Sequence, residues 1–217
     1  YHNLAKLSSI AYTEGFYYVP RIDRKLIQQY KEDLIVLTGN LYGEVPSKVL
    51  NIGENQAEEA LIWWKEQFQE DLYVEIMRHN QEDEKRVNPT LIKLAEQHDI
   101  KIVASNNTYY AEQIDANAHD ILLCVKDGEK QATPIGRGRG YRYGMPNKEY
   151  YFKSSDAMKS LFKDLPQAIS NIQEVLDKIE DYQLSREVLL PKFEIPDAFD
   201  NEDDYLRHIT YQGAEKR

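Results

Sequence analysis

The sequence predicts an α/β fold with a parallel sheet. Three short apolar runs bounded by turn residues alternate with amphipathic helical patterns, in the order strand, helix, strand, helix, strand. Of the 217 residues, 41% are hydrophobic, so the chain is long enough and apolar enough to bury a core. A (β/α) barrel needs seven or eight βα units, and about three are visible here. The chain is therefore either an open sheet or part of a larger barrel.

Two helices are predicted ahead of the first strand. Apolar residues at helical spacing predict one helix over 3–14 and a second over 21–30, with Asp23 in its first turn. The run 34–38 is apolar, β-branched and ended by Gly39, which is typical of a strand buried in a parallel sheet.

The middle of the chain continues this alternation. Pro46 is typical of a first helical turn, and Ala57, Leu61 and Phe68 form one apolar helical face. The predicted elements are a helix ending near Leu50, a helix over 54–68, a strand over 72–77, a helix over 88–98 and a strand over 100–105.

The C-terminal half is predicted to be mostly helical around one irregular segment. Residues 131–147 are rich in glycine, arginine and tyrosine and are predicted to form a loop. The other expected elements are a helix over 115–125, an edge strand over 150–152, a helix over 156–162 capped by Ser155, a helix over 165–179, an extended segment over 189–196 and a helix over 203–216. Four regions follow from this pattern: 1–130, 131–149, 150–189 and 190–217.

Charge and cysteine content argue against several classes of protein. The formal net charge is -10, which argues against the duplex-gripping part of a DNA enzyme, because phosphate contacts need a basic face. No apolar run approaches the ~20 residues that span a bilayer, and no signal peptide opens the chain. The single cysteine, Cys124, permits no internal disulfide and fits a reducing cytoplasm. Because the chain starts on Tyr1, we expect a piece of a longer protein.

Several motifs follow one another along nearly the whole chain. They are Asn3-Leu4-Ala5-Lys6-Leu7-Ser8-Ser9, Leu37-Thr38-Gly39-Asn40-Leu41-Tyr42-Gly43-Glu44-Val45-Pro46, Lys85-Arg86-Val87-Asn88, Ile102-Val103-Ala104-Ser105-Asn106-Asn107-Thr108-Tyr109-Tyr110, Ala118-His119-Asp120-Ile121-Leu122-Leu123-Cys124 and Leu190-Pro191-Lys192-Phe193. This series resembles the polymerase-and-histidinol-phosphatase (PHP) domain of bacterial DNA polymerase III alpha subunits. The resemblance implies a partial, distorted (β/α)7 PHP barrel that lacks its N-terminal strands (1–130). A basic Gly/Arg/Tyr loop (131–149), the helical end of the PHP region (150–189) and a linker with the first helix towards the polymerase palm (190–217) would follow.

The resemblance also locates the late metal ligands of the family. In members that keep the metal site, these are a Cys after Gly, then the Asp and His of an Asn-Asp-x-His motif. The matching positions here are Asn40, Asn107 and Tyr109, and the earlier ligands would lie upstream of Tyr1. An Asn oxygen is a weak ligand, and a Tyr phenol stays protonated near neutral pH. The hypothesis is a degenerate site, with no metal and no catalytic residue in this chain.

Three polar residues are further candidates for a site. We interpret His119 beside Asp120 as structural rather than as half of an acid–base pair. His79 follows a predicted strand and would lie near a barrel rim. It is either a remnant of the site or a structural residue.

Four other residues have structural interpretations of their own. Glu44 is interpreted as stabilising the first turn of a helix, and Cys124 as buried and inert. Trp63 and Trp64 cannot both face inward, so one of them is a candidate contact with another part of the polymerase.

The loop 131–149 carries Arg137, Arg139 and Arg142 among tyrosines. Arginines interleaved with aromatic residues are typical of contacts with phosphates or single strands, so these three are candidate nucleic-acid contacts. The alternative is a mobile loop that packs on a neighbouring domain of the polymerase.

With the resemblance, the sequence predicts a structural and interaction part of the alpha subunit. The parent protein would be a DNA-directed DNA polymerase with Mg²⁺ in its palm, while this chain would hold no cofactor. Expected partners are the palm and thumb of the same subunit, the proofreading exonuclease subunit and, through the parent, primer–template DNA; no membrane is expected. The alternative is a metal-dependent PHP phosphoesterase or 3′–5′ exonuclease domain. A third interpretation, an interaction module unrelated to replication, is disfavoured by the ordered motifs.

Overall fold

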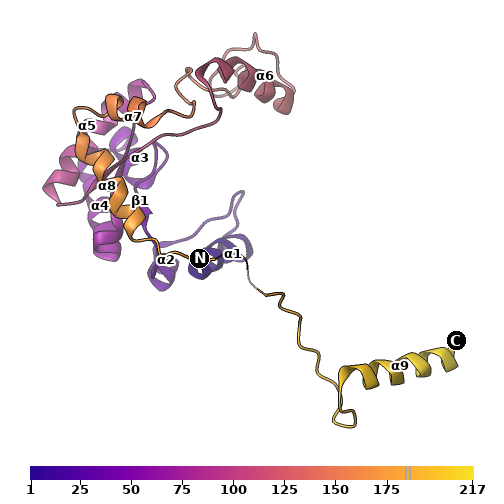
Figure 1. Cartoon of the computed structure of the whole chain (residues 1–217). Helices are drawn as coiled ribbons and strands as arrows, with labels where there is room; N and C mark the ends of the chain where they lie inside the picture. Colours follow the sequence, from indigo (N-terminus) through magenta and orange to yellow (C-terminus); the bar gives the residue numbers. More distant parts are fainter. Residues whose placement is uncertain (184, 186) are drawn as a thin grey trace. The chain divides into compact units, whose positions relative to one another are not determined.

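The structure, a computed structural model, describes residues 1–183, 185 and 187–217, and these form two compact units. The first is Tyr1–Ile179 and the second is Glu180–Arg217 (Figure 1). The boundary falls inside the region 150–189 that the sequence grouped together. Two residues of that region, Leu184 and Arg186, lie outside the described residues.

A parallel sheet lies in the first unit. Its strands, in the order β1-β2-β3, are β1 (Val36–Leu37), β2 (Leu72–Met77) and β3 (Ile102–Ser105). Val36 pairs with Leu72, and Val74 pairs with Ile102. The predicted alternation of strands and helices is therefore confirmed for the described residues, and the crossovers give parallel pairing as expected for βα units. The first strand is shorter than the predicted 34–38, and closure into a barrel stays a prediction.

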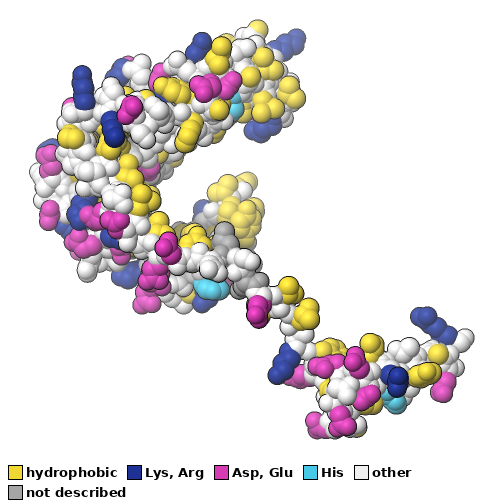
Figure 2. All heavy atoms as spheres, viewed as in Figure 1, with side chains coloured by type: hydrophobic (Ala, Val, Ile, Leu, Met, Phe, Trp, Pro, Cys, Tyr) yellow, Lys and Arg dark blue, Asp and Glu magenta, His cyan; other side chains and the backbone are white. Residues whose placement is uncertain are grey.

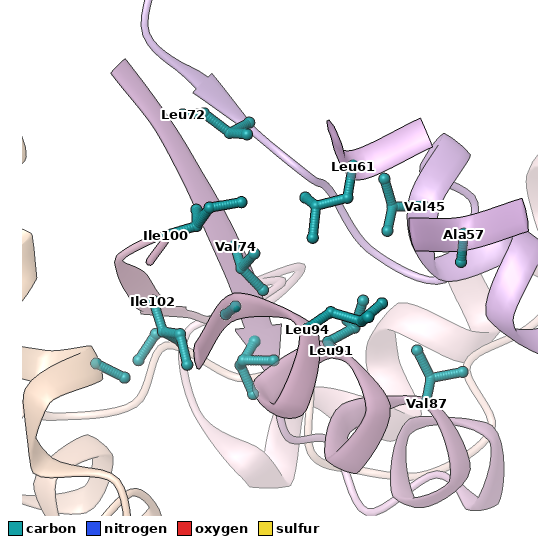
Figure 3. Packing of buried hydrophobic residues seen from close by; sticks show 14 of the residues in the cluster. Val45, Ala57, Leu61, Leu72, Val74, Val87, Leu91, Leu94, Ile100 and Ile102 are labelled. Carbon is teal, nitrogen blue, oxygen red and sulfur yellow. The ribbon is translucent and has the colours of Figure 1, made fainter. Parts of the chain in front are cut away.

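Helices α3 (Glu44–Asn51), α4 (Glu54–Phe68) and α5 (Glu82–Gln97) build the core with the sheet. Figure 3 shows Leu61 of α4 and Leu91 and Leu94 of α5 gathered beside Val74 of β2. All four side chains are buried, and burying such a side chain stabilises the fold by about 1.5–3 kcal/mol. The apolar face predicted for 54–68 thus faces the sheet.

Helix α5 begins at Glu82, so the predicted start at Asn88 is wrong. Gln81 is the N-cap, and a capping box joins its side chain and backbone to Glu84. A start at Asn88 would put Pro89 in the first turn, where its missing N–H costs nothing. In the structure Pro89 lies inside the helix, and the capping box at the true start satisfies the free N–H groups there.

Two helices precede the sheet, α1 (His2–Thr13) and α2 (Arg24–Tyr30). Asp23 caps α2, because its side chain accepts a 2.9 Å hydrogen bond from the backbone N–H of Leu26. Two short 3₁₀ turns, η1 (Gln69–Asp71) and η2 (Gln113–Asp115), lead into β2 and into α6 (Ala116–Asp127). The predicted helices 3–14, 21–30 and 115–125 are confirmed, with shifts of a few residues at their ends.

The segment after the loop differs from prediction in two details. The predicted edge strand over 150–152 is wrong, because only Tyr151 forms a bridge, to Tyr110, and no ladder continues from it. The cap of α7 (Ser155–Leu161) is Ser154 and not Ser155, since the Ser154 hydroxyl accepts from the backbone N–H of Ala157 at 3.2 Å. Helix α8 (Pro166–Asp177) then packs against β3, where Asn171 Nδ2 donates to the Ile102 carbonyl at 2.8 Å.

The second unit contains α9 (Glu202–Lys216). The side chain of Asn201 caps it by accepting from the backbone N–H of Asp204 at 3.0 Å. Phe199 packs edge-on against Tyr205, with ring centroids 5.0 Å apart. In the described part of the chain, none of the helices has the length and apolar character that crossing a membrane requires.

Candidate functional site

A cavity of about 250 Å³ lies at the carboxyl ends of the strands. The carboxyl ends of parallel strands are where α/β folds place their ligand sites. Its walls come from the segments that follow the three strands, from α5 and from the loop before Tyr150. Its polar and aromatic lining residues include Asn40, Tyr42, Glu75, His79, Glu84, Asn107, Tyr109, Tyr143 and Tyr150.

The three positions matched to metal ligands all line this cavity. Asn40 follows β1, and Asn107 and Tyr109 follow β3. Asn40 is thus 67 residues away from Asn107 in the sequence, yet both side chains line the same cavity. The side-chain oxygen of Asn40 accepts a 3.0 Å hydrogen bond from the backbone N–H of Tyr42. Tyr109 is 45% exposed. The three positions therefore converge on one cavity, while their role as former metal ligands stays a prediction.

The turn that carries Asn40 depends on two glycines. Gly39 has φ +79°, a conformation that residues with a Cβ rarely adopt. A Cβ at Gly43 would collide with the carbonyl oxygen of Thr38. Glycine at both positions lets the chain turn tightly from β1 into α3 and brings Asn40 to the cavity.

His79 supplies the one imidazole among the described residues of the cavity wall. Its side chain is 1% exposed, and both ring nitrogens are hydrogen-bonded. Its Nδ1 lies 2.8 Å from Glu84 Oε1, and its Nε2 lies 3.1 Å from the backbone nitrogen of Asn107. Since that N–H must donate, Nε2 is the acceptor and Nδ1 carries the proton that bonds Glu84. No ring nitrogen is left with a free lone pair. The structural interpretation of His79 is the one that this geometry favours.

Glu84 was missed by sequence reasoning. It is 5% exposed, and its Oε2 accepts from the backbone N–H groups of His79 at 2.6 Å and of Gln81 at 3.3 Å. The signal was a Gln81-x-x-Glu84 spacing, which is a capping-box pattern with Gln in place of Ser or Thr. Glu84 therefore caps the N-terminus of α5 and also fixes the tautomer of His79.

Tyr150 closes the cavity beside His79. Its ring stacks on the imidazole with centroids 4.6 Å apart and planes 8° from parallel. Burial, with the nearby charge of Glu84, raises the pKa of the Tyr150 phenol far above its usual value. The segment is held by Asn147, whose Nδ2 donates to the His79 carbonyl at 2.6 Å.

Arg142 anchors the Gly/Arg/Tyr loop instead of extending from it. The side chain is 6% exposed and forms a two-pronged ion pair with Asp120 of α6, at 2.6 and 2.9 Å. It also donates to the carbonyls of Thr133, Gln131 and Tyr143. Every N–H of its guanidinium is used within the protein, so the candidate nucleic-acid contact rests on the other two arginines.

Arg137 and Arg139 are both exposed on this loop. The guanidinium of Arg137 lies over the ring of Tyr42, 5.5 Å from its centroid, and donates to the Tyr42 hydroxyl at 2.7 Å. The loop thus reaches back to the segment after β1 at the mouth of the cavity.

Among the described residues, His119 and Asp120 are not joined by a hydrogen bond or an ion pair, and each has other partners. His119 packs between the rings of Tyr109 and Tyr110, with centroids 5.6 and 5.4 Å away, and Asp120 is paired with Arg142. The guanidinium holds the pKa of the Asp120 carboxyl below its usual range. Both residues therefore have structural contacts, in agreement with their interpretation from sequence.

Glu44 joins three helices rather than only stabilising the first turn of α3. It accepts from Trp64 Nε1 and from Arg24 Nη2, each at 2.9 Å, and pairs with Lys48 at 3.1 Å. Burial alone would raise the pKa of Glu44, but these donors lower it overall. Trp63 is covered by the guanidinium of Arg24, 4.4 Å from its ring, so neither tryptophan is a fully exposed contact surface.

Cys124 of α6 is buried, as predicted. Hydrophobic side chains gather on the outer surface of the same helix in Figure 2, where Ile121, Leu122 and Val125 are exposed. Across the described residues, no group of three or more His, Cys, Asp and Glu side chains is placed to hold a metal ion.

Comparison with known proteins agrees with the ordered motifs. The family model of the PHP domain matches residues 1–79. The alpha subunit of DNA polymerase III from Borreliella burgdorferi is 35% identical over 218 residues, which covers all of this chain and 18% of that protein. The chain belongs to the DNA polymerase III alpha subunit family. The family member from Treponema pallidum is 36% identical over 218 residues, again all of this chain and 18% of its own length.

The family member from Campylobacter jejuni is 33% identical over 244 residues, with all of this chain and 20% of that protein covered. The chain thus spans about a fifth of the length of the alpha subunits it matches. The cavity lies partly within the PHP-matched residues and partly beyond them, because Asn40, Glu75 and His79 come before position 80, while Glu84, Asn107 and Tyr109 come after it.

Proposed function

We propose that this chain is a non-catalytic, structural part of the alpha subunit of a replicative DNA polymerase, and that its strand-end cavity no longer binds metal. The observation that carries the proposal is the donor set of the cavity. The three matched ligand positions are two neutral amides and a phenol, and the imidazole of His79 has both nitrogens engaged. Divalent metals in such sites need carboxylates, thiolates or free imidazole nitrogens. The residues present do not fit the metal cluster of an active PHP domain.

The two carboxylates of the cavity do not change this conclusion. The carboxylate of Glu84 is hydrogen-bonded by His79 and Gln81. Glu75 is a single carboxylate, and no second free anionic or imidazole ligand lies beside it among the described lining residues. One carboxylate supplies too few ligands for a catalytic divalent metal.

The wider role is also a proposal. In the parent protein, template-directed primer extension would take place elsewhere, with Mg²⁺ bound by carboxylates of the palm. This chain would contribute part of a distorted (β/α)7 barrel that packs against the thumb and palm and offers a surface to the proofreading exonuclease subunit. A cytoplasmic location goes with this role. Support comes from the names of the relatives and the full-length match of the chain to them.

The test is metal content and phosphoesterase activity of the full-length protein. After incubation with Mn²⁺ or Zn²⁺ and removal of excess metal, we expect less than one bound metal ion per protein at this cavity and no hydrolysis of a phosphomonoester. Stoichiometric metal that is lost in an Asn107→Ala, Tyr109→Ala variant would overturn the proposal and favour the phosphoesterase or exonuclease alternative.

A matched gain-of-ligand variant shows whether the assay can detect a site here. Asn40→Cys, Asn107→Asp and Tyr109→His together restore the three ligand types at the same positions. If the triple variant binds metal and the unsubstituted full-length protein does not, the loss of metal binding is due to these three side chains.

A further inference from the structure

The described lining of the cavity carries negatively charged side chains and no positively charged one. Among the described residues that line it are two carboxylates, Glu75 and Glu84, and no lysine or arginine. Glu84 is hydrogen-bonded by His79 and Gln81. The carboxylate of Glu75, in contrast, has no hydrogen-bond or ion-pair partner among the described residues; only its backbone N–H is engaged, with the Thr38 hydroxyl at 3.0 Å.

Strand alternation places Glu75 in the wall. Val74 and Ile76 of β2 face the hydrophobic core, so Glu75 and Met77 point to the opposite face, where both line the cavity. Glu75 is only partly exposed. A carboxylate held in a partly enclosed, mixed polar and apolar space is costly unless a counter-charge meets it.

The remaining wall is aromatic. Tyr42, Tyr109, Tyr143 and Tyr150 line the cavity, and the rings of Tyr109 and Tyr150 meet edge to face with centroids 6.0 Å apart. Burial raises the pKa of Tyr143 and of Tyr150, so both stay neutral phenols. The faces of such rings attract cations.

Arg137 does not line the cavity, but its guanidinium contacts one of the lining tyrosines. Arg137 lies over Tyr42 at the mouth, 5.5 Å from the ring centroid, and donates to its hydroxyl. Inside, the side-chain amide of Asn107 adds a hydrogen-bond acceptor next to the rings. The carboxylate of Glu75, the tyrosine rings and the amide of Asn107 together suit a cation that carries both N–H donors and an alkyl group.

We infer that the cavity binds a small free organic cation, an alkylguanidinium or alkylammonium, with its head group on the carboxylate of Glu75 and its carbon atoms against the tyrosine rings. A volume of about 250 Å³ accommodates such a head group with a short alkyl chain. The inference goes beyond the proposed structural role and depends on it in one respect, namely that no metal fills the same space.

The test is calorimetric titration of the full-length protein with n-butylguanidinium, with n-butylammonium and with the neutral isostere n-butylurea. We expect saturable binding of the cations and binding of the urea that is weaker by about tenfold or more, because only the cations pair with a carboxylate. Absence of saturable binding of either cation, or equal binding of the urea, would overturn the inference.

Variants assign the binding to the named groups. Glu75→Gln should weaken cation binding by about tenfold or more, while Glu66→Gln, on the exposed side of α4, should leave it unchanged. Tyr143→Phe keeps the ring and should retain binding, whereas Tyr143→Leu should weaken it by about tenfold. Unchanged binding in Glu75→Gln, with an unaltered circular dichroism spectrum, contradicts the site.

Competition with Mn²⁺ separates this inference from the proposed function. If stoichiometric Mn²⁺ displaces bound butylguanidinium, the proposed loss of metal binding is wrong, while the cation site stands. If neither ligand binds, the cation site is wrong and the structural role is unaffected.

Discussion

The backbone N–H of Asn107 donates to Nε2 of His79 across 3.1 Å, which ties the segment after β3 to the residue that follows β2. Because Nδ1 of the same ring is bonded to Glu84, this imidazole holds three segments of the rim together. A position that looks from the sequence like a candidate metal ligand is therefore a buried structural link.

Replacing His79 by alanine should destabilise the first unit. The change empties a buried site beside Tyr150, removes the short His79 contact of Glu84 Oε1, whose other side-chain donor is Gln81 Nε2 at 3.4 Å, and leaves the Asn107 N–H unpaired. We expect a loss of about 3 kcal/mol in the free energy of unfolding, measured by urea titration. The control is His98→Ala, whose partly exposed pair with Glu58 at 2.7 Å should contribute about 1 kcal/mol or less. Equal losses in the two variants would contradict the structural role of His79.

Removing the guanidinium of Arg142 should free the loop 131–149. In Arg142→Met, proteolysis of this loop at neutral pH should be roughly tenfold faster, since cleavage follows the population of the opened segment. Arg86→Met, which removes an exposed pair with Asp83 at 3.3 Å, is the matched control and should leave loop cleavage unchanged.

The Asp120–Arg142 pair also predicts a pH dependence. Because the folded-state pKa of Asp120 lies below its unfolded value, the pair contributes full stability above the usual carboxyl pKa of about 4. That contribution is lost as pH falls through the lowered folded-state pKa. The carboxyl ¹³C shift of Asp120 should titrate below the usual range, and in Arg142→Met it should return towards it. An unchanged midpoint would contradict the pairing.

Two glycine substitutions should have opposite effects. Gly43→Ala forces a Cβ against the backbone of Thr38 in the tight turn after β1, and should lower the free energy of unfolding by about 2 kcal/mol or more. Gly213→Ala, inside α9 with open space around it, should stabilise that helix by about 0.5–1 kcal/mol. Urea titration checks the first, and amide hydrogen exchange of α9 checks the second. An unchanged free energy of unfolding in Gly43→Ala would contradict the requirement for glycine in this turn.

Reversing the charges of Arg137 and Arg139 tests the nucleic-acid contact. If both touch phosphates, the double Glu variant of the full polymerase should weaken primer–template binding and flatten the slope of log K against log salt by about 1 per arginine. Arg86→Glu on α5 is the control for a general change in charge. An unchanged slope would leave the loop as a packing element.

Local patterns predicted the elements whose apolar spacing is continuous. The helix 54–68 and the strand 72–77 match α4 and β2 residue for residue, because burial on one face leaves a clear period in each. Prediction failed at the start of α5, because the capping box of Gln81 and Glu84 was not recognised from the sequence. It also failed at 150–152, whose aromatic residues favour a strand although only Tyr151 finds a bridging partner.

The sequence by itself determined the family, through motifs that keep their order, and it determined which residue types stand at Asn40, Asn107 and Tyr109. Only the tertiary structure decided what surrounds them. In the folded chain, Glu84 is hydrogen-bonded to His79, and Arg142 is paired with Asp120 instead of extending into solvent. Glu75 lines a cavity whose other walls carry tyrosines. These outcomes depend on contacts between residues far apart in the chain, and the free energy of a buried hydrogen bond or ion pair depends on partners that local spacing does not specify.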